Sequence, residues 1–176
     1  GTASSRVLAG TCKPGEGEML ASSAKDLREH DLASKSVSSV LTRLCTSVTA
    51  QGPFLLSLPN VVHLATDVHA RLGEAHLLDL VTALHPTAAV CGTPRDAAMR
   101  LIEDLEDTER GRYSGPVGWV DTAGDGEFAI ALRCGLTSGT RLRLFAGAGI
   151  MPDSDPDAEL AETEAKMRPL LDALGV

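Results

Sequence analysis

The organisation of this chain is set by the stretch GAGIMP (residues 147–152), which continues through DSDP (153–156) into ELAETEAK (159–166). The residues before it, 142–146, have the apolar alternation of a β-strand. Gly147 and Gly149 leave their backbone amides unshielded, so a ligand can approach them closely. The Asp and Pro residues that follow are typical of a helix start. The stretch therefore predicts a strand, a ligand-facing turn and a helix.

The predicted helix carries charged side chains at helical spacing. Glu159 and Glu162 are three residues apart and share one face, and Lys166 lies one turn further along. Exposed amides, two carboxylates and an ammonium can jointly hold a carboxylate-bearing ligand and a divalent cation. Each feature also has an ordinary explanation, because paired glutamates often form a solvated face and a Glu-to-Lys pair four apart supports a helix by itself.

A second acidic pair lies nearer the N-terminus. The apolar pattern predicts a long amphipathic helix from Ser22 to about Val48, capped by Ser22 or Ser23. Asp26 and Glu29 are again three residues apart on one face of it. Two helices with facing carboxylates would form an oxygen cage for Mg²⁺, which binds through a few carboxylates and keeps several waters.

Composition narrows the class of protein. The chain has 176 residues, enough for one domain with its own core. Its net charge of −8 disfavours nucleic acid and anionic membrane surfaces as partners. No apolar run reaches membrane-spanning length, and a signal pattern is missing at the N-terminus. The cysteines lack CxxC spacing, which indicates reduced thiols in a cytoplasmic protein and no zinc site; they are Cys12, Cys45, Cys91 and Cys134.

Several motifs resemble the chorismate-utilising enzymes, the family of the isochorismate, salicylate, anthranilate and aminodeoxychorismate synthases. The GAGI turn with E-x-x-E-T-x-x-K (159–166) is similar to the family's C-terminal signature. SAKDLREH (23–30) resembles its S-x-K-D-x-x-E-H motif, and RGRYSGPVGW (110–119) resembles R-G-x-Y-x-G-x-V-G-W. The loop LHPTAAVCGTP (84–94) resembles that of isochorismate synthases, whereas anthranilate and aminodeoxychorismate synthases have a loop closer to P-A-G-T-x-S-G-A-P-K.

The resemblance implies a magnesium site on the two acidic helices. Glu29 and Glu162 would be the direct ligands of the metal ion. Asp26 and Glu159 would hold metal-bound waters. For His30, which follows Glu29, we expect a packing or helix-surface role rather than ligation.

The resemblance also implies a pocket for chorismate. His63 lies in an apolar strand, either as a core histidine or as a pocket residue that hydrogen-bonds the substrate. Thr87 would face the substrate and the reacting water, or would simply occupy a turn. Arg133 would bind the enolpyruvyl carboxylate, unless it pairs with an acidic residue such as Glu106. The other substrate-binding residues implied by the family are Tyr113, Gly147, Ala148, Gly149 and Lys166.

The predicted fold class is α+β, with an antiparallel sheet and packed helices. We expect the sheet to consist mainly of hairpins in residues 114–150, with the long helix and the C-terminal helix packed on it. Residues 1–176 would form one chorismate-binding domain, the C-terminal half of a fold in which two such sheets face each other with helices outside. The absence of an initial Met also favours a piece of a longer chain.

The predicted function is the Mg²⁺-dependent conversion of chorismate to isochorismate, in a siderophore or a menaquinone pathway. By resemblance, the general base and acid lie in a missing N-terminal half, which would be the chain's partner. Alone, the chain is expected to be inactive and to expose the surface that meets that half. A salicylate synthase-like enzyme and a non-catalytic, degenerate binding domain are the alternatives.

Overall fold

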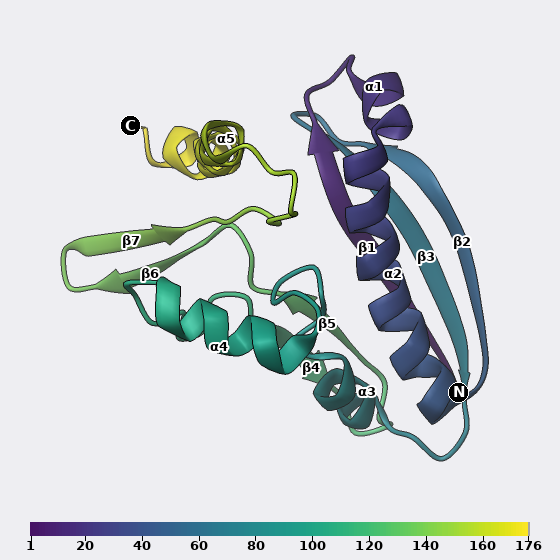
Figure 1. Ribbon diagram of the computed structural model, residues 1–176. Helices are drawn as coiled ribbons and strands as arrows, with labels where there is room; N and C mark the ends of the chain where they lie inside the picture. Colours follow the sequence, from purple (N-terminus) through teal and green to yellow (C-terminus); the bar gives the residue numbers. More distant parts are fainter. Residues whose placement is uncertain (176) are drawn as a thin grey trace.

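The central element of the structure is a three-stranded antiparallel sheet. The computed structural model describes residues 1–175, and in it β1 (Thr2–Cys12), β3 (Val62–Leu72) and β2 (Cys45–Ser57) lie side by side in that order (Figure 1). The middle strand, β3, is the most buried of the three. Its continuous run of buried residues is typical of a strand that is covered on both faces.

One face of this main sheet is covered by α2 (Ala24–Leu44), which follows the short α1 (Gly17–Ser22) (Figure 1). Ser23 caps α2, because its hydroxyl accepts a hydrogen bond from the Asp26 amide at 3.3 Å. The buried residues of α2 recur every three or four positions, which places them on one face. The core between α2, the sheet and α3 consists of Val7, Ala9, Ala33, Val37, Leu41, Val68, Ala70 and Leu80.

Helix α2 is shorter than the sequence predicted, because it ends at Leu44 rather than near Val48. β2 begins at the next residue with several β-branched side chains and pairs with β3. The break predicted at Gly52-Pro53 is a bulge inside β2, where a proline is tolerated because no ladder hydrogen bond is required of it. A side chain at position 52 would collide with Thr66, so the close approach of β2 to β3 requires glycine there.

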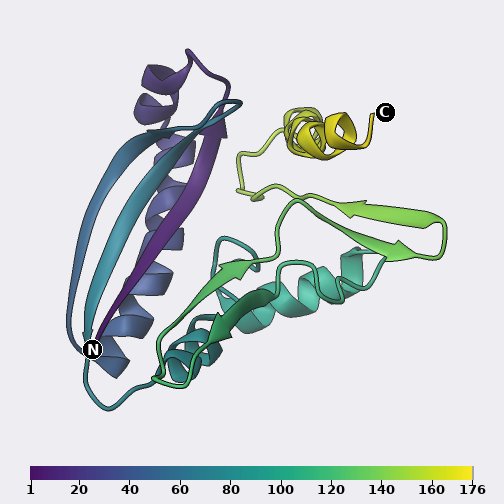
Figure 2. The same cartoon turned by 180° about the vertical axis from the view of Figure 1, so that it is seen from behind.

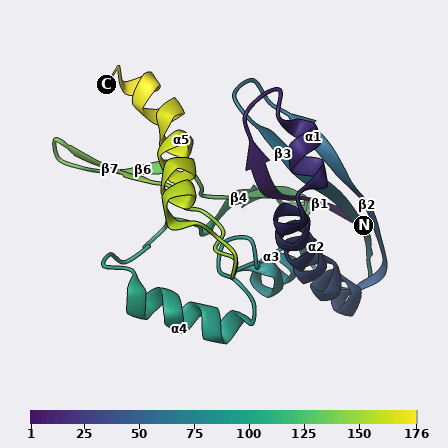
Figure 3. The same cartoon turned by 45° about the horizontal axis from the view of Figure 1, so that its top comes forward.

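The second half of the chain forms two hairpins and three helices. α3 (Leu77–Leu84) and α4 (Arg95–Leu105) come first, and α5 (Pro156–Leu174) comes last. Between them lie the hairpins β4–β5 (Pro116–Val120 and Gly126–Ile130) and β6–β7 (Cys134–Ser138 and Arg141–Phe145). Seen from behind, the hairpins extend away from the main sheet (Figure 2). α4 and α5 lie on opposite sides of the hairpin region (Figure 3).

The α+β class and the antiparallel pairing agree with the sequence-based prediction, but the predicted sheet was the wrong one. The main sheet comes from residues 2–72, and α2 packs on it rather than on the hairpins. The reason is length and burial. The main strands are 11 to 13 residues long, and β1 and β3 bury residues under α2. The hairpin strands have five residues each and remain largely exposed.

Apolar side chains are exposed over the hairpins and α4. They include Val117, Trp119, Leu136, Leu101 and Leu105, each more than half exposed. Exposed apolar surface of this extent is typical of a region that meets another part of a protein. None of the helices within residues 1–175 has the length and apolar character needed to cross a membrane.

Candidate functional site

The turn that follows Gly149 leads directly into α5, and side chains of the turn hydrogen-bond its backbone amides. Asp155 caps the helix by accepting a hydrogen bond from the Ala158 amide at 2.9 Å, with Pro156 in the first turn, as predicted. The Ser154 hydroxyl accepts from the Met151 amide at 2.9 Å and donates to the carboxylate of Glu159 at 2.6 Å. The turn therefore presents the first carboxylate of α5 in a fixed position.

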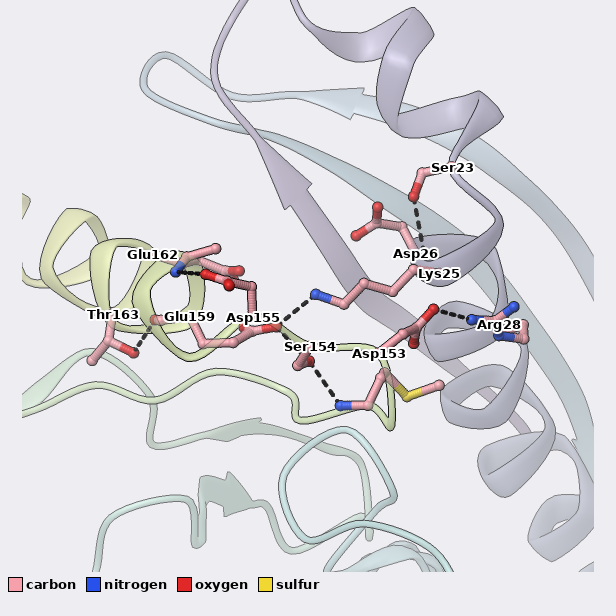
Figure 4. Close-up of polar contacts among 12 residues, drawn as sticks. Ser23, Lys25, Asp26, Arg28, Asp153, Ser154, Asp155, Glu159, Glu162 and Thr163 are labelled. Atoms are coloured by element: carbon pink, nitrogen blue, oxygen red, sulfur yellow. Dashed lines mark hydrogen bonds and ion pairs between the residues drawn. The ribbon is translucent and has the colours of Figure 1, made fainter.

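Two ion pairs join this part of the chain to α2 (Figure 4). Lys25 Nζ lies 2.6 Å from Glu159 Oε1, and Arg28 pairs with Asp153. Burial raises the pKa of Glu159, but hydrogen bonds from Lys25 and Ser154 outweigh it and leave the pKa below its usual value. Glu159 is therefore a buried carboxylate that holds α5 against α2. Its predicted role toward metal-bound waters remains a prediction.

Glu29 from α2 and Glu162 from α5 converge beside the glycine turn. The Glu29 carboxylate lies against the Cα of Gly149, where any side chain would collide with it. Burial, and after it the charges of Glu162 and Asp26, raise the pKa of Glu29 to about 7, against the opposing charges of Lys166 and Lys25. Carboxylates from two helices thus share one small region, which is the geometry that a common ion would need.

Lys166 connects this region to the turn. Its ammonium pairs with Glu162 at 2.6 Å and donates to the Gly147 carbonyl at 3.0 Å. The Lys166 ammonium, which we predicted to bind substrate, therefore contacts the Glu162 carboxylate and the Gly147 carbonyl. An anion bound at the turn would compete with Glu162 for this ammonium, while a cation at Glu162 would release it.

His63 lies close to the same cluster, on β3. Its Nδ1 is 2.9 Å from the Thr11 hydroxyl, and its Nε2 is 3.4 Å from Arg133 Nη2. Burial lowers the pKa of His63, and the positive charge of Arg133 lowers it further. The ring is therefore neutral at pH 7. His63 is 5% exposed and contacts Thr11 and Arg133, as expected of a core histidine; its hydrogen bond to substrate stays a prediction.

Arg133 lies outside the hairpin strands. β5 ends at Ile130, and Arg133 lies in the connection to β6 with φ = 47°, a left-handed conformation that costs energy for a residue with a side chain. The suggested pairing with Glu106 is wrong, because Glu106 forms a two-pronged ion pair with Arg110 at 2.6 and 2.8 Å. The guanidinium of Arg133 turns to the imidazole of His63 instead.

Tyr113 marks the other end of the site. Its ring stacks on Phe145 with centroids 5.4 Å apart, and its hydroxyl lies where a side chain at Gly147 would be. Burial raises the pKa of Tyr113, so the hydroxyl is a donor at pH 7. A cavity of about 310 Å³ adjoins it, lined by Glu106, Arg110, Tyr113, Phe145, Gly147 and Ala148 among others.

Thr87 and His30 lie outside this cluster. The Thr87 carbonyl accepts hydrogen bonds from the Val90 and Cys91 amides, and the next residue, Ala88, approaches Ser36 of α2 about two turns beyond Glu29. The role of Thr87 toward substrate stays a prediction. His30 is 2% exposed and bonds the Ala9 carbonyl and the Thr66 hydroxyl, so it is the packing histidine that we expected.

The chemistry of the donors fits Mg²⁺ held jointly by protein and ligand. Within residues 1–175, no group of three or more His, Cys, Asp or Glu side chains is arranged as a complete metal site. Mg²⁺ often binds through only one or two carboxylates, together with water and substrate oxygens. Glu29 and Glu162 would supply that set, and a bound cation would offset both the burial and the repulsion from Glu162 that raise the Glu29 pKa.

Comparisons with known proteins identify the lineage. Residues 1–175 match the family described as chorismate binding enzyme. The chain belongs to this family. Isochorismate synthase MenF of Bacillus subtilis is 40% identical over 185 residues, in an alignment that covers 99% of this chain and 39% of MenF. The chain thus spans about two fifths of the length of this relative.

Solved structures place the fold in the same family. DhbC from Bacillus anthracis superposes with a TM-score of 0.94 at 37% identity, covering 99% of this chain and 49% of DhbC. Anthranilate synthase component I from Streptococcus pneumoniae gives 0.83 at 31% identity, covering 96% and 39%. Because enzymes named for different reactions share this chorismate-binding fold, the reaction has to be argued from the site.

Three residues of the site were missed as participants by sequence reasoning. Lys25 pairs with Glu159, Thr11 contacts His63, and the Arg110 guanidinium lies 5.8 Å from the centroid of the Tyr113 ring. Lys25 was visible as the cation one turn before Glu29, in the SAKDLREH motif. Arg110 was also visible, as the first residue of the RGRYSGPVGW motif and three residues before Tyr113. Thr11 gave no comparable signal, because its partner His63 lies 52 residues away in sequence.

Proposed function

We propose that this chain is part of an isochorismate synthase, a magnesium-dependent enzyme that converts chorismate to isochorismate. The observation that carries the proposal is the convergence of Glu29 and Glu162 beside the turn at residues 147–149. A partly buried acidic pair next to the amides of residues 147–149 repels a dianionic ligand, so such a ligand would bind there only together with a cation. The relative named isochorismate synthase MenF and the loop at residues 84–94 favour this reaction over others of the family.

In this proposal the chain holds the ligand by its two carboxylates. Arg133 and Tyr113 donate to the enolpyruvyl carboxylate, together with the amides of residues 147–149. Glu29 and Glu162 hold the metal ion, and Asp26 and Glu159 orient its waters. Bound Mg²⁺ would supply a Lewis acid that stabilises negative charge on the ring carboxylate. Lys166, which pairs with Glu162 and the Gly147 carbonyl, would be available to a ligand carboxylate if Glu162 held a cation.

The reaction moves a hydroxyl group around the ring: water adds at carbon two while the hydroxyl at carbon four leaves. No oxidant is needed, but one base must take a proton from the water and one acid must give a proton to the leaving hydroxyl. We assign neither role to the described residues and place both in a partner segment outside this sequence. His63 and Thr87 contact the substrate and the reacting water without transferring these protons. The chain alone should therefore bind chorismate without turning it over.

The proposal is tested by calorimetric titration of chorismate into the purified chain, with and without millimolar Mg²⁺. We expect binding that requires Mg²⁺ and weakens at least about tenfold in Glu162→Gln, because a metal ligand is lost. Glu164→Gln is the matched control. Glu164 lies on the same helix, is exposed, and is not among the predicted ligands.

Several outcomes distinguish the alternatives. Equal binding by wild type and Glu162→Gln would contradict the proposed site. Full turnover by the isolated chain would contradict the proposal that the general base and acid lie in a partner segment. If binding is seen but turnover stays absent after the upstream half of a relative is supplied as a second chain, the domain is a non-catalytic binding module. Product analysis of that mixture separates isochorismate from salicylate.

A further inference from the structure

Two buried histidines in this structure are each paired with a threonine, on opposite faces of the main sheet. His30 on α2 bonds Thr66 on the helix-covered face, and His63 bonds Thr11 on the other face. His63 and Thr66 are three residues apart on β3, so their side chains point to opposite sides. The first pair lies in the core, whereas the second adjoins Arg133 and the candidate site.

The neighbours of His63 determine which of its nitrogens carries the proton. The Arg133 guanidinium can only donate, so Nε2 at 3.4 Å from it must be the unprotonated acceptor. A neutral imidazole carries one N–H, which is then on Nδ1. On that side the Thr11 hydroxyl, at 2.9 Å, is free to accept, and the backbone of the adjacent Gly10 also hydrogen-bonds the ring.

The backbone is shaped to bring Thr11 to this position. The ladder between β1 and β3 is regular up to Leu8 and then shifts register, so that Thr11 stands opposite His63. Gly10, with φ = 80°, occupies the bulge between them, and a side chain there would press on Leu64 at 3.2 Å. Bulges of this kind re-aim side chains beside functional sites.

We propose that Thr11 is a positioning residue, whose hydroxyl holds His63 in the Nδ1–H form and so presents Nε2 to the ligand as a hydrogen-bond acceptor. The 3.4 Å contact with Arg133 is long for a hydrogen bond, so a ligand carboxylate can take the guanidinium and leave Nε2 free. A hydroxyl of the ligand, which can donate, then satisfies that nitrogen. Arg133 and His63 together recognise a carboxylate next to a hydroxyl, an inference that rests on the function proposed above.

The tautomer is measured without any ligand, by long-range ¹H–¹⁵N correlation spectra of the ¹⁵N-labelled chain at pH 7.5. We expect a protonated Nδ1 and an unprotonated Nε2 for His63. Thr11→Val, which removes the hydroxyl at nearly constant volume, should add a clear Nε2–H population, and Thr11→Ser should keep the wild-type pattern. Thr66→Val is the matched control, because it should change the signals of His30 and leave those of His63 unaltered.

An Nε2–H signature in the wild type, or an unchanged pattern in Thr11→Val, would overturn the inference. In the second arm, chorismate is titrated in the presence of Mg²⁺. We expect the Kd to rise about tenfold in Thr11→Val, because one well-placed hydrogen bond is lost. In Thr11→Ser, which keeps the hydroxyl, the Kd should stay within about twofold of the wild-type value. An unchanged Kd in Thr11→Val overturns the role of Thr11 while leaving the proposed function intact. Absence of binding by the wild type overturns the proposed function, and the ligand-free spectra still test the tautomer.

Discussion

Helices α2 and α5 carry the two halves of the candidate site, but they are held in place by different forces. α2 lies on the main sheet through an apolar stripe that includes Val37 and Leu41. In the described part of α5 the buried residue is Glu159, a carboxylate, and Leu160 beside it is 60% exposed. One helix is therefore fixed by apolar burial, and the other is attached mainly through ion pairs and hydrogen bonds at its start.

This difference matters because Glu29 and Glu162 face each other across the seam between the two helices. Apolar burial is insensitive to ions, whereas contacts between charges depend on pH, salt and bound metal. The position of α5, and with it that of Glu162, should therefore respond to ligands more than the position of α2 does. Elements with few buried apolar contacts are also those that open first in a native protein.

The comparison is tested most strongly in the core under α2. Leu41 is 2% exposed, so Leu41→Ala should lower the free energy of unfolding by about 2–5 kcal/mol, through lost burial and the cavity left behind. Leu160→Ala on α5 is the matched control and should change it by less than about 0.5 kcal/mol. Urea unfolding followed by circular dichroism measures both. Similar losses for the two variants would show that α5 is packed as α2 is.

The ion pair between the helices gives a smaller and more local effect. Lys25→Met leaves the buried Glu159 carboxylate with only its Ser154 hydrogen bond, which should cost about 1–3 kcal/mol. Hydrogen exchange should show faster exchange of α5 amides and unchanged exchange in β3. Arg28→Ala removes the exposed pair with Asp153 and should cost less than about 1 kcal/mol. Equal protection of α5 in both variants would mean that the buried pair does not anchor it.

Much of the site was predictable because it depends on local patterns. Helical spacing put Asp26 with Glu29 and Glu159 with Glu162, and the Asp-Pro sequence gave the start of α5. That the two helices bring Glu29 and Glu162 together was predicted from the resemblance to a family, because spacing within one segment carries no information about another segment. The α+β class and the antiparallel pairing followed from the same alternation of apolar residues.

What could not be predicted depends on tertiary contacts. The end of α2 was misplaced because residues near Val48 are compatible with helix and strand, and pairing with β3 decides between them. The conformation of Arg133 and its approach to His63 arise from a connection between two hairpins that alternation does not describe. The bulge that aims Thr11 at His63 is likewise a property of the strand pair and not of either strand.

The smallest expected effect concerns the protonation of Glu29, which lies between α2 and α5. Its pKa is raised to about 7 in the folded chain, above the ordinary 4.5, so the folded form binds more protons between these values. The free energy of unfolding should therefore fall as pH rises from about 4.5 to 7 and stay low above it. Glu29→Gln removes the penalty, and should stabilise the chain at pH 8 by on the order of 1–2 kcal/mol after solvent screening, with little change at pH 4.

Thermal unfolding across this pH range measures the effect, with the exposed Glu103→Gln as a control that should keep the pH dependence of the wild type, because it retains Glu29. Millimolar Mg²⁺ supplies a second readout, because an ion that binds the folded form raises its melting temperature. It should stabilise the wild type at pH 8 and have a smaller effect on Glu29→Gln. A melting temperature of Glu29→Gln that matches the wild type at both pH values, with and without Mg²⁺, would mean that neither burial nor the charge of Glu162 disfavours the ionised Glu29. The seam would then be an ordinary polar contact between two helices.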